Sequence, residues 1–151
     1  MESLDRQILA LLARDGRMSY TDIGKATGLS TSAAQQRVRR LEQRGVITGY
    51  GARISPAALG MELTAFVAVR PFDQSQPDDV PERLVDLHEV ISCYSVAGEA
   101  NYLLKVQVAT PGHLEQLLGR IRTAARVSSV TTVVLSTAFA DRPIVVADER
   151  Q

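Results

Sequence analysis

The stretch from Leu29 to Gly45, LSTSAAQQRVRRLEQRG, decides the fold of the first third of the chain. It predicts a helix that Ser30 caps, because a serine hydroxyl before the helical pattern accepts a free backbone N–H of the first turn. Leu29 is placed to pack on Ala34 as a hydrophobic staple. Gly45 is expected to end the helix, since glycine adopts the left-handed conformation without a Cβ clash.

The predicted helix has two unlike faces. Apolar residues recur at i, i+4 and i+7 and form one buried stripe, namely Ala34, Val38 and Leu41. The polar and basic residues that point away from it are Ser32, Gln36, Arg39, Arg40 and Gln43. A face that only meets solvent usually mixes acids and bases in i, i+4 pairs. Serine, glutamine and arginine instead contact phosphates and read base edges, so the face is either a DNA-binding surface or a plain solvated basic surface.

If the face binds DNA, its residues divide by role. We predict that Ser32, Gln36 and Arg39 contact base edges. Arg40 and Arg44 are expected at phosphates or in structural contacts. Arg37 flanks the buried stripe, so a structural ion pair is as well supported as a DNA contact. The complete predicted DNA site is Ser30, Thr31, Ser32, Gln35, Gln36, Arg37, Arg39, Arg40 and Arg44.

Charge is distributed unevenly along the 151 residues, although the formal net charge is zero. Residues 1–53 carry nine Lys or Arg and five Asp or Glu, a net charge of +4. The remainder carries eight and twelve, a net charge of −4. This asymmetry favours a basic binding head on a mildly acidic body.

Several other classes of protein find little support. The apolar runs are too short to cross a bilayer and no signal peptide opens the chain, so we expect a cytoplasmic protein with no membrane partner. The lone Cys93 allows no internal disulfide and is expected to be buried filler. His88 and His113 have no metal-ligand spacing, so we predict no metal, no cofactor and no catalytic residues.

The first fifty residues predict a winged helix-turn-helix. A first helix runs from Leu4 to about Arg14, with Ser3 as its cap; its inward residues are Leu4, Ile8, Leu11 and Leu12. A second starts at Ser19, with Asp22 completing a box-like cap; Ile23 and Ala26 point inward. A tight turn at Thr27-Gly28 leads into the basic helix. Residues 46–50 are predicted to form a wing strand, and residues 51–61 a linker.

The second half predicts a ferredoxin-like domain over residues 62–151. Strands are expected at residues 63–69, 90–96, 102–108 and 129–137, with a short helix that Asp79 caps and a longer one after Thr110-Pro111. The order βαββαβ places both helices on one face of an antiparallel sheet. The other face would be a bare apolar surface, so we expect it to meet a partner chain.

One turn and one acidic pair have two interpretations each. Residues 98–102, Gly-Glu-Ala-Asn-Tyr, form either a hairpin turn or the lip of a small-ligand site. In the second case backbone N–H groups would bind a carboxylate, and Glu99 and Asn101 an ammonium. Asp78-Asp79 is either a pair of catalytic carboxylates or a helix cap, and the helix cap is the better interpretation.

Three stretches resemble the Lrp/AsnC regulators, the leucine-responsive and asparagine-sensing class. They are LDRQILALLARDGR followed by the Ile23–Ser30 turn, RVRRLEQRGVITGY at Arg37–Tyr50, and YSVAGEANYLLKV at Tyr94–Val106. The resemblance implies a winged helix-turn-helix, a β-strand linker, a ferredoxin-like body, dimers that commonly build octamers, and control by a small amino acid.

The resemblance also implies an effector site. The family's loop carries Gly, a variable stretch and then Asp-Tyr; Gly98 and Tyr102 match, and Asn101 stands at the Asp position. The implied effector residues are Gly98, Glu99, Ala100, Asn101, Tyr102 and, on the last strand, Thr132, Val134 and Ser136.

The sequence therefore predicts a homodimeric or octameric transcriptional regulator that binds double-stranded DNA and an amino-acid-type effector. Two rivals remain at this point. One is a metabolite-sensing adaptor whose basic helix is only a solvated surface. The other is a small ferredoxin-like dimeric enzyme, which would need an acid–base pair on the sheet.

Overall fold

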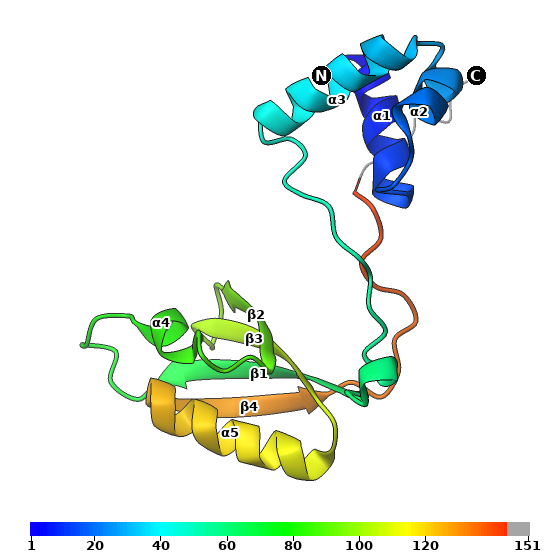
Figure 1. Ribbon diagram of the computed structural model, residues 1–151. Helices are drawn as coiled ribbons and strands as arrows, with labels where there is room; N and C mark the ends of the chain where they lie inside the picture. The colour runs from blue at the N-terminus through cyan, green and yellow to red at the C-terminus, as the bar shows by residue number, and fades with distance from the viewer. Residues whose placement is uncertain (145–151) are drawn as a thin grey trace. The chain divides into compact units, whose positions relative to one another are not determined.

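The computed structural model describes residues 1–144, which fall into two compact units (Figure 1). The first unit, the head, comprises residues 1–53 together with the described residues from Phe139 on. The second unit, the body, spans Ile54–Ala138. The predicted C-terminal domain extends to Gln151, and its last seven residues lie outside the described part. None of the helices within residues 1–144 has the length and apolarity needed to cross a membrane.

The head is built from three helices, α1 Ser3–Arg14, α2 Tyr20–Thr27 and α3 Thr31–Gln43. Their apolar faces meet in one cluster: Ile8, Leu9, Ile23, Ala34, Val38 and Leu41. The predicted helix-turn-helix is therefore confirmed, with α2 and α3 joined by Gly28 in the left-handed conformation (φ 74°).

The caps of α3 confirm the helix predicted from residues 29–45. The Ser30 hydroxyl accepts the backbone N–H of Ala33 at 3.1 Å. At the other end Gly45 has φ 67° and its N–H donates to the Glu42 carbonyl at 2.9 Å. The N–H of Val46 donates to the Leu41 carbonyl, also at 2.9 Å. These two bonds form a Schellman motif, which satisfies carbonyls that the end of the helix leaves free.

Two local predictions for α1 and α2 were wrong. Ser3 is the first helical residue, and Glu2 holds the cap position without a side-chain cap bond. Ala26 is exposed, and Gly24 is buried in its place. A Cβ at Gly24 would lie 2.6 Å from the Leu29 carbonyl oxygen, so the close approach of α2 to the turn requires glycine.

The predicted wing strand at residues 46–50 was also wrong, because no described segment pairs with it. The N–H groups of Val46 and Ile47 instead donate to the Leu41 carbonyl at the end of α3. The Tyr50 hydroxyl donates to Glu42 Oε1 at 2.7 Å, which ties the segment to α3. The linker carries a short 3-10 helix, η1 Ala57–Leu59, where the resemblance implies a strand.

The body has the predicted βαββαβ order. Its elements are β1 Leu63–Pro71, α4 Val80–Leu84, β2 Val90–Ser95, β3 Tyr102–Val108, α5 Pro111–Ala125 and β4 Val127–Val133. The strands form an antiparallel sheet in the order β2-β3-β1-β4, so the ferredoxin-like topology is confirmed.

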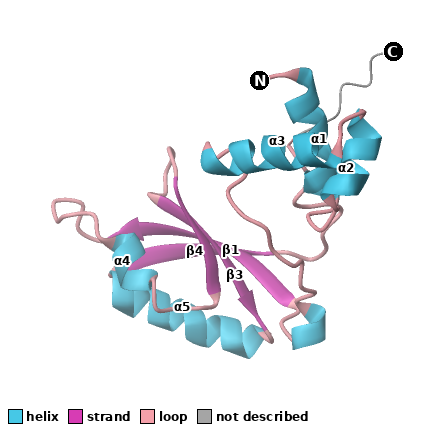
Figure 2. Cartoon of the chain, turned by 45° about the horizontal axis from the view of Figure 1, so that its top comes forward, coloured by secondary structure: helices cyan, strands magenta, loops and turns pink. Residues whose placement is uncertain are grey.

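The helices α4 and α5 pack on one face of this sheet (Figure 2). Alternate residues of β1 and β3 point into the core there, for example Val67 opposite Leu104. The other face, hereafter the open face, carries the alternate residues of β1, β3 and β4: Thr64, Phe66, Ala68, Arg70, Leu103, Lys105, Gln107, Ser128, Val130 and Thr132. Val130 is 71% exposed on it, as expected for a face that no described element covers.

Three details of the body differ from prediction. Strand β4 ends at Val133, not Thr137, because its partner β1 begins at Leu63 and the last bond runs from the Val134 N–H to the Thr64 carbonyl. Cys93 is exposed, since it lies on the edge strand β2. Asp79 holds the cap position of α4, but its carboxylate accepts from Arg83 Nε at 2.7 Å and makes no cap bond.

Candidate functional site

The outward face of α3 is fully available to a partner. Ser32, Gln36, Arg39, Arg40 and Gln43 are all exposed, and the stripe behind them is buried. Within residues 1–144, Arg39, Arg40 and Arg44 make no ion pair. The α3 face therefore presents unneutralised cations beside amide and hydroxyl groups.

Arg37 is built into the head instead. Its guanidinium donates to Glu2 Oε2 at 2.6 Å and to Asp5 Oδ1 at 2.8 Å. The hydrogen bond to Glu2, followed by that to Asp5, raises the pKa of Arg37 above its usual value. The Asp5 side chain is only 7% exposed, so Arg37 compensates a buried charge and links α3 to α1.

The start of α3 holds the other predicted DNA residues. The Ser30 hydroxyl, besides capping the helix, lies 3.2 Å from the hydroxyl of Ser32. Thr31 Oγ1 lies 3.4 Å from Thr21 Oγ1, which links the two helices of the motif. Gln35 is half-buried beside the stripe. The predicted set thus comes together on one helix, with Arg37 and Gln35 set back from its outermost face.

A hollow of about 450 Å³ lies beside the turn that joins β2 to β3. The turn is closed by the Val96 N–H donating to the Asn101 carbonyl, and it is held to β1 by the Asn101 N–H donating to the Val69 carbonyl, both at 3.0 Å. In the described chain the N–H groups of residues 97–100 donate to no backbone carbonyl. The lining residues are Arg70, Gln74, Asp78, Ser95, Val96, Ala97, Gly98, Glu99, Ala100 and Asn101.

Tyr102, expected at the lip of this hollow, points to the other side of the sheet. Its ring is buried in the core, 9% exposed, and its hydroxyl donates to Asp78 Oδ2 at 2.8 Å. The hydrogen bond to Asp78, followed by burial, raises the pKa of Tyr102 to about 12. Tyr102 therefore positions Asp78 and does not line the turn.

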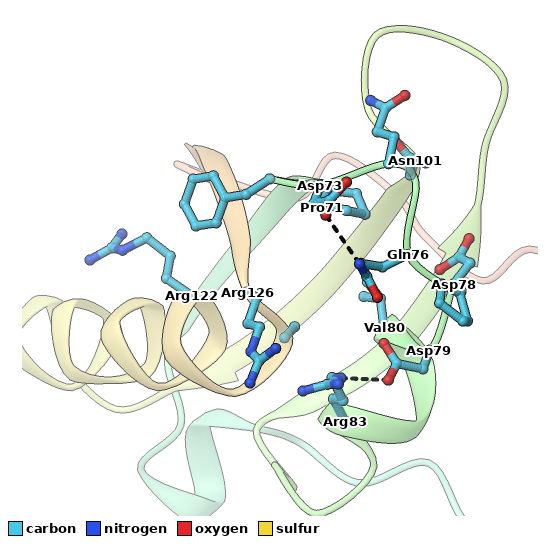
Figure 3. Close-up of a pocket in the computed structure, with 14 residues that line it drawn as sticks. Pro71, Asp73, Gln76, Asp78, Asp79, Val80, Arg83, Asn101, Arg122 and Arg126 are labelled. Carbon is cyan, nitrogen blue, oxygen red and sulfur yellow. Dashed lines mark hydrogen bonds and ion pairs between the residues drawn. The ribbon is translucent and has the colours of Figure 1, made fainter.

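A second cavity of about 830 Å³ adjoins the first and is drawn in Figure 3. It lies between the loop after β1 and the end of α5, and shares Gln74, Asp78 and Asn101 with the hollow. Part of its charge is paired within the chain, because Arg83 pairs with Asp79 and Gln76 Nε2 donates to Asp73 Oδ2 at 3.3 Å, whereas Arg122 and Arg126 make no ion pair within residues 1–144. Asp78 and Asn101 lie on the side of the cavity away from Arg122 and Arg126 (Figure 3).

Comparison with known proteins assigns each of the two units to a domain family. Residues 1–42 match the AsnC-type helix-turn-helix domain and residues 64–144 match the Lrp/AsnC ligand binding domain. The chain is 53% identical over 142 residues to the HTH-type transcriptional regulator LrpA of Mycobacterium tuberculosis, covering 94% of this chain and 95% of that protein. The chain belongs to the Lrp/AsnC family.

Two further Lrp/AsnC proteins extend the comparison. The leucine-responsive regulatory protein of Escherichia coli is 36% identical over 122 residues, which cover 79% of this chain and 74% of that protein. A solved structure of a feast or famine regulatory protein from M. tuberculosis complexed with L-methionine is 52% identical, with a TM-score of 0.92; the match covers 95% of this chain and 98% of that one. This chain is accordingly a transcriptional regulator, and the enzyme alternative is rejected.

The effector residues that the Lrp/AsnC resemblance implies do not meet within one chain. Gly98, Glu99, Ala100 and Asn101 line the hollow at the end of β1 that holds Val69. Thr132 pairs with Phe66 and Val134 bonds Thr64, both toward the start of β1. Ser136 lies beyond the end of β4, so the predicted alternation with Thr132 does not reach it. Within the described chain these two groups of residues therefore lie at different positions along β1.

Two residues of the hollow escaped the sequence-based prediction. Arg70 looked like the end of an apolar strand, and Asp78 looked like part of a helix cap. Their proximity to Gly98 arises only when β1 pairs with β3, a contact between segments about thirty residues apart. The available signal was that Arg70 directly follows the strand expected at residues 63–69, and that Asp78 directly precedes the expected cap Asp79.

Proposed function

We propose that this Lrp/AsnC regulator binds operator DNA as a dimer or larger assembly through the α3 face, and that a small amino acid bound in the body modulates it. One observation carries the DNA-binding part. The apolar stripe of α3 is buried, while Arg39 and Arg40 stay exposed and unpaired within residues 1–144 on the opposite face. Such a helix can enter a major groove without disturbing the packing of the head.

The residues of α3 take different roles in this proposal. Ser32, Gln36 and Arg39 contact base edges, where arginine and glutamine form bidentate pairs with guanine and adenine. Arg40 and Arg44 contact phosphates and add affinity without sequence preference. Ser30 and Thr31 place the first turn near a phosphate. Arg37 holds α3 on α1 through Glu2 and Asp5, so it acts as a positioning residue.

The open face of the sheet is the surface through which the bodies pair in this proposal. It combines exposed Val130 with Phe66 and Leu103, which are diagonal neighbours on β1 and β3: Leu103 and Val130 flank Ala68 on its two sides, and Phe66 pairs with Lys105. Burying apolar area of this kind is what drives obligate homodimers. Octamers are proposed on the family resemblance alone.

The effector is proposed to be a small apolar amino acid such as L-methionine. The support is the solved relative that is complexed with L-methionine, together with a hollow large enough for such a ligand and bordered by residues 97–100, whose N–H groups donate to no backbone carbonyl in the described chain. In this proposal two copies share the pocket: one copy supplies the turn at residues 97–101, and the other supplies the region around Thr132.

Fluorescence anisotropy on the DNA upstream of the chain's own gene tests this proposal. We expect binding to survive excess random competitor DNA and to change when L-methionine is added. The adaptor alternative predicts equal affinity for upstream and random DNA at every salt concentration, and that result would contradict the proposal.

A further inference from the structure

The hollow beside the 97–101 turn contains opposite charges that the chain itself leaves separate. Arg70 enters it from β1, Asp78 from the loop before α4, and Glu99 from the turn. No ion pair joins Arg70 to an acid anywhere in residues 1–144. A hollow that presents a cation and acids without pairing them is suited to a ligand that carries both charges.

Of the two acids, Asp78 is held in place. Its Oδ2 accepts the hydroxyl of Tyr102, whose ring is anchored in the core between the sheet and the helices. Glu99 is exposed at the turn and makes no hydrogen bond or ion pair in the described chain. A carboxylate that is already positioned loses less conformational entropy when it binds a ligand, so Asp78 is the better partner for an ammonium.

We propose that Asp78 and Arg70 are the charged contacts of the effector. Asp78 binds the ammonium group, while Arg70 and the N–H groups of residues 97–100 bind the carboxylate. The inference rests on the proposed amino-acid response. It accounts for how the hollow recognises an amino acid although the neutral Asn101 stands where the family resemblance implies an aspartate, because Asp78 borders the same space as Asn101.

The position of Arg70 connects this contact to assembly. Arg70 lies on the open face, paired across the sheet with Ser128 of β4. Exposed charge pairs are weak because water screens them. A second copy packed on the open face would remove that water, so the charged contacts would strengthen on dimerisation.

Calorimetry on the full-length protein tests the two contacts separately. Three probes are titrated: L-methionine, its methyl ester without the carboxylate charge, and 4-(methylsulfanyl)butanoic acid without the ammonium. In wild type, loss of either charge is expected to weaken binding about tenfold, the size of one charge-assisted contact. Asp78→Asn should weaken L-methionine about tenfold and abolish its advantage over the probe without ammonium. Arg70→Gln should also weaken L-methionine about tenfold, and should abolish its advantage over the methyl ester.

Matched variants separate this inference from its rivals. Asp79→Asn removes a neighbouring acid that pairs with Arg83 and lines only the larger cavity, so both preferences should persist. Asparagine at position 78 keeps an oxygen for the Tyr102 hydroxyl, and an unchanged Tm will show that the fold is intact. Loss of the ammonium preference in Glu99→Gln, with Asp78→Asn unaffected, would overturn the assignment.

The same titrations distinguish a failure of the proposed amino-acid response from a failure of the Asp78 and Arg70 assignment. If wild type binds none of the three probes while upstream DNA is still bound specifically, the amino-acid response is wrong and the inference falls with it. If L-methionine binds and neither Asp78→Asn nor Arg70→Gln alters the preferences, only the inference is wrong.

Discussion

The α3 face and the turn hollow differ in how the chain builds them. The α3 face comes from thirteen consecutive residues, Thr31–Gln43, and its outer side chains carry no packing duties. The hollow combines three segments. Arg70 comes from the end of β1, Asp78 from the loop before α4, and residues 97–101 from the turn between β2 and β3. A site on one helix can change residue by residue without loss of fold. The composite site depends on the core, because the buried Tyr102 holds its Asp78.

The largest expected effect on stability comes from the apolar cluster in which the three helices of the head meet. Leu41 is fully buried beneath the α3 face. Leu41→Ala should lower the free energy of unfolding of the head by about 2–5 kcal/mol, because it removes apolar contacts and leaves a cavity. Chemical denaturation followed by circular dichroism measures the loss, with Leu59→Ala in the exposed linker as control. Equal destabilisation by both variants would mean that α3 is not anchored through this stripe.

The second effect separates assembly from folding. Phe66→Asp places a charge at the centre of the open face, where pairing with a second copy would bury it without a partner. We expect the dimer dissociation constant to rise at least about a hundredfold, roughly 3 kcal/mol. Sedimentation equilibrium measures it, and Glu115→Lys on α5, an exposed position on the helix-covered side, is the control. An unchanged oligomer in Phe66→Asp would place the interface elsewhere.

A smaller effect concerns the neutral residue in the effector turn. Asn101→Asp adds a second carboxylate beside the hollow, next to Asp78, and should tighten binding of at least one ordinary amino acid by up to about tenfold. Calorimetry with the twenty amino acids measures the change. If no amino acid binds more tightly to Asn101→Asp, position 101 does not contact the ammonium that Asp78 is proposed to bind.

The smallest effect compares one tyrosine in each unit. Tyr50 is half exposed, and burial together with its bond to Glu42 raises its pKa to about 12; Tyr102 reaches a similar value chiefly through Asp78. A raised folded pKa means that the stabilisation is present below pH 10 and is lost as the pH rises through about 12.

Because Tyr102 is buried and Tyr50 is not, Tyr102→Phe should cost about 1 kcal/mol at pH 7 and Tyr50→Phe less. Each variant should also remove one group that titrates near pH 12 in the ultraviolet spectrum. Two identical stabilities, or titration of both hydroxyls near their ordinary value, would contradict the assigned bonds.

The sequence could predict what depends on local periodicity. Ala34, Val38 and Leu41 at helical spacing located α3, and Ser30 and Gly45 located its ends, since caps act within a few residues. Alternation located β3, and the order of elements then implied the topology. The acid that Arg37 would pair with could not be predicted, because Asp5 lies 32 residues away.

What the sequence could not predict depends on contacts between distant segments. The strand expected at residues 46–50 has β-forming side chains but no described partner, and a strand needs one. Asp78 has the sequence context of a helix cap, and only the fold brings it to Tyr102 and to the turn. The residues predicted to contact DNA come from one helix, whereas those predicted for the effector depend on contacts between distant segments.

The central claim is that the α3 face reads sequence, and a single comparison tests it most directly. Affinities of wild type, Arg39→Ala and Arg40→Ala are measured for upstream and random DNA across a range of salt concentrations. The account predicts that Arg39→Ala loses about 1–3 kcal/mol on upstream DNA and relaxes the preference at one base pair. It predicts that Arg40→Ala weakens both DNAs alike and lowers the salt slope by about one. Equal losses on both DNAs for both variants would contradict it.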